Sequence, residues 1–391
     1  MTSTNPLERL LHALDRGSGF DDVDEPLLWA CLDAAGVTGA WREAVIAAGG
    51  PARVLEKGAV PAFAEPSRRA RLLDYAGIAM RVATLDPWLR MGGRVVADPL
   101  EMRRFMAAPV TCFYGAGTGR VPDPLAPVVA VVGSREADIG YIERTARVCS
   151  ALAEAGVVVC SGGARGVDKA AQKSARLHQG SVVVVSPEVA LKRPDDVAVD
   201  PGLCWLSPFA PWSRAAKWMC VERNTWIAAA ADVVVVICGD ATSGTRHTVT
   251  AALRMGRPVV TLPVLDVHSK MSVIPRALLE HGIGHEIDDD VDVDALLRLQ
   301  PRAGAREAWS AFTKGQAQQP ALPGFLREQA AFDDDAPALL RLLRASGGSL
   351  LIDEAAAKLQ TTMRELLVDA AALEVDGALR REGALLCLVR R

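Results

Sequence analysis

Short apolar runs alternate with longer stretches of helical periodicity between residues 128 and 263. The first run, Val128–Val132, is rich in β-branched residues and stops at a glycine turn, and the apolar residues after it have helical spacing. Similar runs follow at 157–160, 182–185, 203–206, 233–237 and 259–262. Buried strands that alternate with helices predict a mostly parallel sheet covered on both faces, the Rossmann-like α/β class.

The flanking patterns predict smaller domains. Residues 1–64 are expected to form a helical, SAM-like module, and residues 65–300 the extended Rossmann-like domain, with loop-rich chain at one sheet edge. Residues 301–335 are polar, contain proline and have weak periodicity, which predicts an interdomain linker. Residues 336–391 follow the order helix, helix-turn-helix and hairpin, which predicts a winged-helix domain.

The last helix expected in the winged-helix domain covers residues 362–373. In such modules this helix can enter the DNA major groove. It carries Arg364 but also Glu365 and Asp369. Because the helix is not strongly basic, contact with protein or packing within the domain is favoured over duplex binding.

Composition and charge narrow the functional classes. The chain has 391 residues, 50% of them hydrophobic, and a net charge of −3, so any DNA binding must come from a local basic site. No segment has the length and flanks of a secretion signal or membrane span, so we expect a cytoplasmic protein without a membrane partner. The eight isolated cysteines are expected to be reduced core residues, and the acidic run 288–294 a solvated loop rather than a metal site.

Glycines, hydroxyl residues and arginines follow several of the predicted strands. In doubly wound sheets, ligands bind outside the carboxyl ends of the strands. Glycine lets the backbone approach an anion, helix N-termini point N–H groups at it, and arginine adds a charge-assisted fork. We therefore predict that phosphate of a ligand is bound by Gly133, Ser134, Arg135, Ser161, Gly162, Gly163, Arg165, Gly166, Arg223, Asn224, Ser243, Gly244 and Thr245.

The cationic and amide candidates also have structural alternatives. Arg135 and Arg165 are expected to contact phosphate rather than form surface ion pairs, because each lies in a glycine turn directly after a strand. Arg223 and Asn224 either hold a nucleotide or brace the neighbouring loop, and the pattern favours the ligand.

The hydroxyl and acidic candidates are more evenly balanced. Ser161 and Ser243 either donate to phosphate or cap the following helices. Asp168 can interact with a helix dipole and orient Arg165, or be purely structural. His247 is interpreted as solvated or capping, because no nucleophile or paired carboxylate lies near it in sequence. No catalytic residue, metal or cofactor is assigned, and no Walker, Gly-x-Gly-x-x-Gly, His-Glu-x-x-His or Gly-x-Ser-x-Gly motif is present.

The order of elements and four segments resemble the DNA-processing protein A (DprA/Smf) family. Residues 161–168, Ser-Gly-Gly-Ala-Arg-Gly-Val-Asp, are similar to its Ser-Gly-x-Ala-Arg-Gly-Ile-Asp signature, and residues 131–135 to its opening strand and turn. Residues 222–228 resemble its x-Arg-Asn-Arg-Ile-Ile-Ala segment, and residues 243–245 its Ser-Gly-Ser turn. The resemblance implies a non-enzymatic, dimeric single-stranded DNA-binding protein that loads the RecA recombinase during natural transformation or repair.

The segment 220–225 departs from the family pattern. Thr225 stands where the family has a second arginine, and Cys220-Val221 where it has Phe-Pro. Loss of the phenylalanine removes a base-stacking surface, worth roughly 1–3 kcal/mol per base where such stacking operates. Trp218 or Trp226 can substitute for it, although Trp226 is expected to be a core residue.

Two other functions are compatible with parts of the sequence. A small-nucleotide sensor or phosphoribohydrolase would use a related sheet with a Pro-Gly-Gly-x-Gly-Thr loop, of which residues 240–245 share only Gly244-Thr245. A scaffold acting through the winged helix alone is the third possibility. A thermal-shift assay that compares free nucleotides with oligonucleotides separates the nucleotide sensor or phosphoribohydrolase from a DNA-binding protein.

Overall fold

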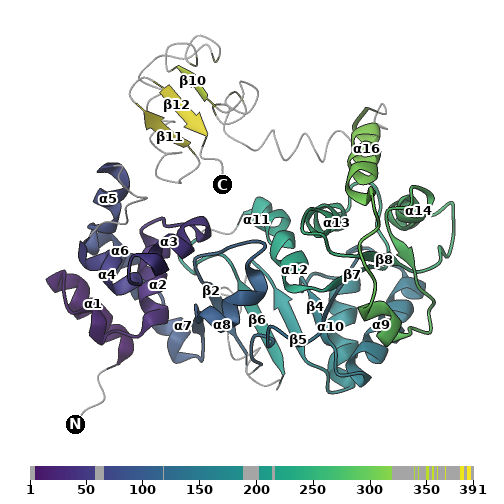
Figure 1. Ribbon diagram of the computed structural model, residues 1–391, viewed down its shortest axis with the longest axis horizontal. Helices are drawn as coiled ribbons and strands as arrows, with labels where there is room; N and C mark the ends of the chain where they lie inside the picture. Colours follow the sequence, from purple (N-terminus) through teal and green to yellow (C-terminus); the bar gives the residue numbers. More distant parts are fainter. Residues whose placement is uncertain are drawn as a thin grey trace. The chain divides into compact units, whose positions relative to one another are not determined.

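The computed structural model describes residues 5–57, 66–117, 119–187, 202–213 and 216–318, together with parts of the region between 339 and 388. The chain forms two compact units, Met1–Gln316 and Ala317–Arg391 (Figure 1). Within the described residues, none of the helices is both long enough and apolar enough to span a membrane.

A nine-stranded sheet forms the centre of the first unit. Its strands lie in the order β1-β2-β6-β5-β4-β3-β7-β8-β9. β2 is antiparallel to both of its neighbours, and the other pairs are parallel. The predicted mostly parallel α/β sheet is therefore confirmed. The strands are β1 (Arg94–Val96), β2 (Phe113–Ala116), β3 (Val128–Val132), β4 (Val158–Ser161), β5 (Val182–Val185), β6 (Leu203–Ser207), β7 (Val233–Val236), β8 (Val259–Thr261) and β9 (His285–Glu286).

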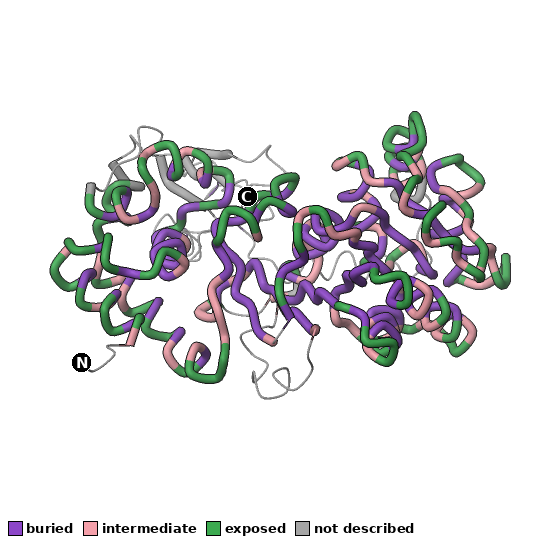
Figure 2. The backbone as a smooth tube through the Cα atoms, turned by 60° about the horizontal axis from the view of Figure 1, so that its bottom comes forward, coloured by how far each residue is buried: buried purple, intermediate pink, exposed green. Residues whose placement is uncertain are grey.

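Helices cover both faces of this sheet. Val129 and Val131 of β3 belong to one buried cluster, whereas Val128, Ala130 and Val132 belong to the other. Successive side chains of a strand point to opposite faces, so a continuous apolar run supplies both cores. Figure 2 shows these central strands buried along their length. One face carries α9 (Ile139–Glu154) and α10 (Val167–Leu177), and the other α12 (Asn224–Ala230), α13 (Thr245–Arg254) and α14 (Val273–Glu280).

The strand order reverses between β3 and β7. From β3 the chain runs outward through β4, β5 and β6, then returns to the other side of β3 to form β7. Ligands of open α/β sheets bind at such a switch point, outside the carboxyl ends of the strands. The turns after β3, β4 and β7 meet at this end of the sheet, which we call the rim.

Helices of the N-terminal region extend beyond the boundary at residue 64 that the sequence predicts. Ile78 and Val82, one turn apart on α6, are buried in the same core as α1 and α2. The helical layer therefore continues past that boundary. Its helices are α1 (Pro6–Arg16), α2 (Glu25–Ala34), α3 (Arg42–Ala47), α4 (Pro51–Lys57), α5 (Pro66–Leu72), α6 (Tyr75–Ala83) and α7 (Asp86–Arg90), with 3-10 turns at Phe20–Asp22 and Gly39–Trp41.

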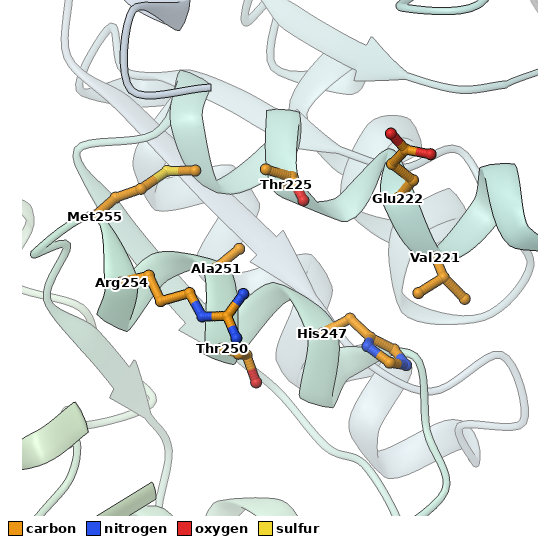
Figure 3. Close-up of a pocket in the computed structure, with 8 residues that line it drawn as sticks. All are labelled: Val221, Glu222, Thr225, His247, Thr250, Ala251, Arg254 and Met255. Carbon is orange, nitrogen blue, oxygen red and sulfur yellow. The ribbon is translucent and has the colours of Figure 1, made fainter. Parts of the chain in front are cut away.

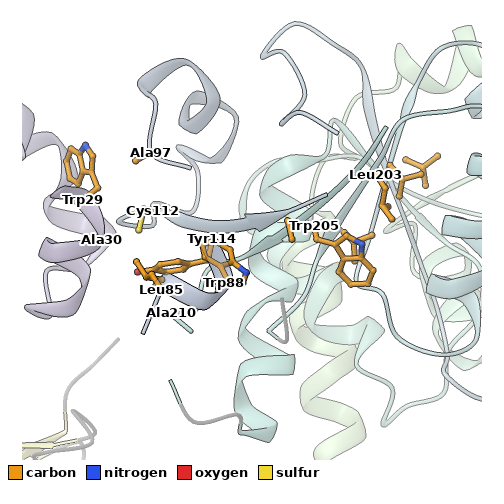
Figure 4. Packing of buried hydrophobic residues seen from close by; sticks show 14 of the residues in the cluster. Trp29, Ala30, Leu85, Trp88, Ala97, Cys112, Tyr114, Leu203, Trp205 and Ala210 are labelled. Atoms are coloured by element: carbon orange, nitrogen blue, oxygen red, sulfur yellow. The ribbon is translucent and has the colours of Figure 1, made fainter. Parts of the chain in front are cut away.

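Buried polar contacts fix this helical layer against the β1–β2 edge of the sheet. The Arg42 guanidinium donates to the carbonyl oxygens of Ala97 and Thr111 and lies 4.1 Å from the ring centre of Trp29. The Tyr114 hydroxyl donates to Asp33 Oδ2 at 2.8 Å. Figure 4 shows the surrounding apolar cluster, in which aromatic rings of both parts pack together.

The predicted linker contains a helix. Ala305, Ala308, Trp309 and Phe312 follow helical spacing and pack on the sheet core, and Trp309 Nε1 donates to Thr250 Oγ1 at 2.8 Å. The predicted linker start at residue 301 is therefore wrong, because α16 (Ala305–Gln318) buries an apolar stripe. The rest of the predicted linker lies outside the described residues.

The acidic run and the described cysteines have structural roles. Asp289 contacts Arg144 at 2.6 Å and Arg147 at 3.4 Å, and Asp292 accepts the Ala295 N–H at 2.9 Å. In the described chain no cluster of His, Cys, Asp or Glu is placed to hold a metal. The described cysteines are free thiols, and all but Cys220 are buried. The remaining short helices are α8 (Pro99–Met102), α11 (Lys217–Glu222) and α15 (Val293–Leu297), with 3-10 turns at Arg103–Phe105 and Lys270–Ser272.

The second unit contains a three-stranded antiparallel sheet in the order β10-β12-β11. Its strands are β10 (Ser349–Leu351), β11 (Leu379–Glu382) and β12 (Leu385–Leu388). Leu339, Ala355 and Leu366 are buried helical residues, and Leu366 lies within the predicted helix 362–373. The rest of the predicted helix 362–373 lies outside the described residues, so the winged helix stays a prediction.

Candidate functional site

The turns after β3 and β4 are in direct contact at the rim. Val167 N–H donates to the Ser134 carbonyl at 3.2 Å. Gly166 has φ +73°, and a Cβ there would lie 2.3 Å from the same carbonyl oxygen. A Cβ on Gly133 would lie 2.5 Å from Val167 Cγ2. Only glycine at both positions permits this close approach, so the two predicted turns form one surface.

Arg223 lies beneath this surface rather than on it. Its side chain is 6% exposed, and Nη1 donates to the Val185 carbonyl at 3.0 Å while Nη2 lies 3.7 Å from Asp168 Oδ2. A Cβ on Gly162 would lie 1.2 Å from Nη1, so the guanidinium occupies the space above that glycine. The expected phosphate contact of Arg223 is therefore replaced by the bracing role that the sequence left as its alternative.

Asp168 pairs with Arg223 rather than with Arg165, which agrees with the structural alternative for this carboxylate. It is 6% exposed, and its Oδ2 also accepts the Ala164 N–H at 3.3 Å. Burial raises the pKa of this carboxyl, although the Arg223 charge acts in the opposite direction. The pair holds the turn between β4 and α10 in place from below.

Ser161 is also a structural residue. It is completely buried, and its hydroxyl donates to the Val131 carbonyl at 3.2 Å, which links β4 to β3. Phosphate contact by Ser161 is thus not supported. Ser134 is nearly buried, and its Oγ accepts the Glu136 N–H at 3.1 Å. Both hydroxyls are therefore engaged in hydrogen bonds within the protein.

The turn after β7 is joined to the same assembly through Asn224. Asn224 is 6% exposed, and its Nδ2 donates to the Gly244 carbonyl at 3.4 Å. Ser243 Oγ accepts the Thr245 N–H at 3.3 Å and lies 2.9 Å from Thr245 Oγ1. Asn224, Ser243 and the buried Thr245 therefore shape the turn, which agrees with the bracing and capping alternatives.

Two exposed arginines are left to face solvent at the rim, beside the N-terminus of α10. Arg135 and Arg165 are exposed, and within the described chain neither has a hydrogen-bond or ion-pair partner. α10 begins after Gly166 and has no side-chain cap at its N-cap position, whereas the first N–H of α13 is accepted by Ser243 Oγ. Cations beside N-terminal N–H groups form an anion-binding arrangement. The structure thus brings the four predicted segments together, but divides them into a buried frame and an exposed face.

The two tryptophans proposed as stacking surfaces differ in burial. Trp226 is buried, and its Nε1 donates to the Ala108 carbonyl at 2.9 Å, so it is the core residue that the sequence predicts. Trp218 is 40% exposed and packs edge-on against Phe209 with ring centres 5.4 Å apart.

An open pocket beside the rim was not predicted. It lies between α11–α12 and α13 and has a volume of about 180 Å³ (Figure 3). His247, Thr250, Ala251 and Arg254 line one wall at helical spacing i, i+3, i+4 and i+7. This stripe of mixed polarity was the signal in the sequence, because a helix face that packs only on a core would be more uniformly apolar.

Fold and rim together define a Rossmann-like protein that presents cations and backbone N–H groups at a topological switch point. The family model for DNA recombination-mediator protein A matches residues 98–292, which include this whole arrangement. The chain belongs to the DNA recombination-mediator protein A family.

Relatives and a solved structure carry the same family name. The chain is 30% identical over 255 residues to the provisionally named DNA processing protein DprA of Mycobacterium tuberculosis, a match covering 56% of this chain and 64% of that protein. It is 31% identical over 178 residues to DNA processing protein DprA of Streptococcus pneumoniae, covering 43% and 61%. These matches span less than two thirds of either relative. The crystal structure of the Streptococcus pneumoniae protein superposes with a TM-score of 0.54 at 22% identity, covering 69% of this chain and 97% of that one, which shows a shared fold.

Proposed function

We propose that this chain binds single-stranded DNA at the rim and acts as a recombination mediator without catalysing a reaction. The observation that carries the proposal is the exposure of Arg135 and Arg165 beside the glycine turn at the N-terminus of α10. Arg135 and Arg165 contact phosphate through their side chains. The backbone of the glycine turns, at Gly133, Gly163, Gly166 and Gly244, approaches the strand closely.

A polynucleotide fits this site better than a free nucleotide does. The cations lie on two adjoining turns of an exposed face, and the net charge of the chain is −3, so binding depends on this local arrangement. Asp240, the acidic residue of the 240–245 loop, accepts the N–H and hydroxyl of Thr242 at 2.7 Å each. Its carboxylate is thus engaged in the turn, which gives no support to the phosphoribohydrolase alternative.

The finer parts of the proposal rest on family membership. They are delivery of the strand to the RecA recombinase in natural transformation or repair, a cytoplasmic homodimer, and a winged helix at 336–391. The three-stranded sheet of the second unit is compatible with that winged helix.

Titration of labelled oligonucleotides at two salt concentrations tests the proposal. We expect single strands to bind more tightly than duplexes of the same length, with an affinity that falls steeply as salt rises, because phosphate contacts release counterions. A parallel thermal-shift screen compares oligonucleotides with free nucleotides. Stabilisation by a free nucleotide without any oligonucleotide binding would contradict the proposal and favour a nucleotide sensor.

A further inference from the structure

The pocket between α11–α12 and α13 continues directly from the rim. Glu222 and Thr225 line it from either side of the Arg223-Asn224 pair, and His247 lines it from the first turn of α13. The Asn224 side chain, bonded to the Gly244 carbonyl, joins these two walls. The pocket therefore begins where the proposed phosphate contacts end.

The length of α13 sets how far the pocket extends from the rim. Arg254 lies nine residues after Thr245 on α13, and a helix rises 1.5 Å per residue, so the two are about 14 Å apart along the axis. Arg254 is exposed at the far end of the pocket. A strand held at the rim can thus pass over the pocket.

Between the rim and Arg254, the lining suits a nucleobase rather than a phosphate. Val221, Ala251 and Met255 supply apolar surface, and Glu222 and Thr225 supply polar groups at the side (Figure 3). Bases unstacked from a strand are bound by apolar contact with their faces and hydrogen bonds to their edges. A carboxylate in the wall repels phosphate but accepts hydrogen bonds from amino groups of a base.

The histidine in the pocket fits the same interpretation. Desolvation and the positive charge of Arg246 both lower the pKa of His247. Its ring is therefore neutral at neutral pH, where it offers a flat surface and a hydrogen-bonding nitrogen instead of a charge. Histidine is among the side chains on which unpaired bases stack.

We propose that this pocket binds a nucleobase of the strand whose backbone lies at the rim. The inference rests on the proposed function. Thr225 stands where the family pattern has arginine. Because its side chain is short, it leaves open the pocket that it lines. Met255 lines the pocket with a flexible thioether that adapts to the face of a base.

A comparison of normal and abasic oligonucleotides tests the proposal. Fluorescence anisotropy measures the affinity of the full chain for a single-stranded oligonucleotide and for one of equal length and charge that lacks its bases. We expect the wild type to prefer the normal strand by about tenfold, the size of one base–protein contact. Thr225→Leu fills the pocket without changing charge and is expected to remove most of this preference while leaving abasic affinity unchanged. Thr225→Ser keeps the pocket open and is the matched control.

A second variant guards against local misfolding. Met255→Ala removes apolar surface without adding bulk, and we expect it to lower the preference two- to fivefold, a loss of part of one base contact. Wild-type preference in both Thr225→Leu and Met255→Ala would overturn the pocket assignment and leave the rim intact. Absence of binding to either oligonucleotide by the wild type would instead overturn the proposed function.

Discussion

Arginines serve opposite purposes at the edge and at the rim of the same sheet. At the β1–β2 edge, Arg42 is 9% exposed, donates to two carbonyl groups and stacks on Trp29. At the rim, Arg135 and Arg165 are exposed, and among the described residues they have no hydrogen-bond or ion-pair partner. Arg42 thus stabilises the contact between the helical layer and the sheet edge, whereas the charges of Arg135 and Arg165 remain available at the surface. Burial and partners, not the residue type, separate the two roles.

Arg223 shows that an arginine near the rim is not necessarily exposed. It belongs to a segment at the rim, yet its guanidinium is buried against Asp168 and the Val185 carbonyl. Its chemistry is that of Arg42. The rim therefore consists of an exposed cationic layer supported by a buried ion pair.

Removal of the buried cation at the rim should have the largest effect on stability. Arg223→Met leaves the Asp168 carboxylate buried without its partner, and breaking such a pair costs about 3–5 kcal/mol. Denaturant unfolding at pH 7 measures this loss. A variant as stable as the wild type would show that Arg223 is not a bracing residue.

The same variant should have a distinctive pH dependence. Burial already raises the pKa of Asp168 above the ordinary value of 3.8, and loss of the opposing Arg223 charge raises it further. A carboxyl whose pKa is raised by folding stabilises the fold at low pH, and that contribution is lost as the pH rises through the raised value. The stability gap between wild type and Arg223→Met should therefore narrow as the pH falls from 7 toward 4. A gap that widens would contradict the assignment.

Substitution of Arg42 at the β1–β2 edge should cause the next largest loss of stability. Arg42→Met leaves the Ala97 and Thr111 carbonyls without a donor, and each buried unsatisfied group costs about 1–3 kcal/mol. We expect a loss of about 2–4 kcal/mol in unfolding free energy. Affinity of the folded fraction for single-stranded DNA should not change, and a selective loss of binding would remove the contrast between edge and rim.

A hydrogen bond of Trp309 helps to hold α16 against the sheet domain, and its removal should have a smaller effect on stability. Trp309→Phe keeps the apolar ring but removes the hydrogen bond to Thr250 Oγ1, which is worth about 1 kcal/mol. Unfolding experiments on the full chain measure this change. An unchanged stability would indicate that α16 does not dock through this bond.

Most of the sheet could be predicted because its signal is local. A β-branched run such as Val128–Val132 specifies a buried strand by itself, and strands that alternate with helices specify a parallel arrangement. The helix 305–318 was missed because glutamine and glycine residues obscure the apolar spacing of Trp309 and Phe312. Its stabilising contacts come from a distant segment, which periodicity cannot reveal.

The sequence was sufficient to predict which turns form the site, but not which of their side chains are buried and which are exposed. Glycine and strand ends place Arg135, Arg165 and Arg223 at one end of the sheet. The burial of Arg223 depends on β5 lying next to β4, which brings the Val185 carbonyl within reach. The pocket beside α13 likewise depends on how two helices pack, so only the mixed stripe around His247 signalled it.

The most direct test removes the two exposed cations and measures the salt dependence of binding. Arg135→Ala combined with Arg165→Ala should change unfolding free energy by less than about 0.5 kcal/mol, because neither side chain has a structural partner among the described residues. The exposed pair Arg69→Ala with Arg71→Ala in α5 provides a control with the same change of charge.

The readout is the slope of log affinity for single-stranded DNA against log salt concentration. Because the double variant cannot neutralise two of the phosphates, we predict weaker binding and a slope shallower by about 1.4, roughly 0.7 for each phosphate, while the α5 control keeps the wild-type slope. Affinity and slope equal to those of the wild type in the Arg135 and Arg165 double variant would contradict the central claim that the rim binds the strand.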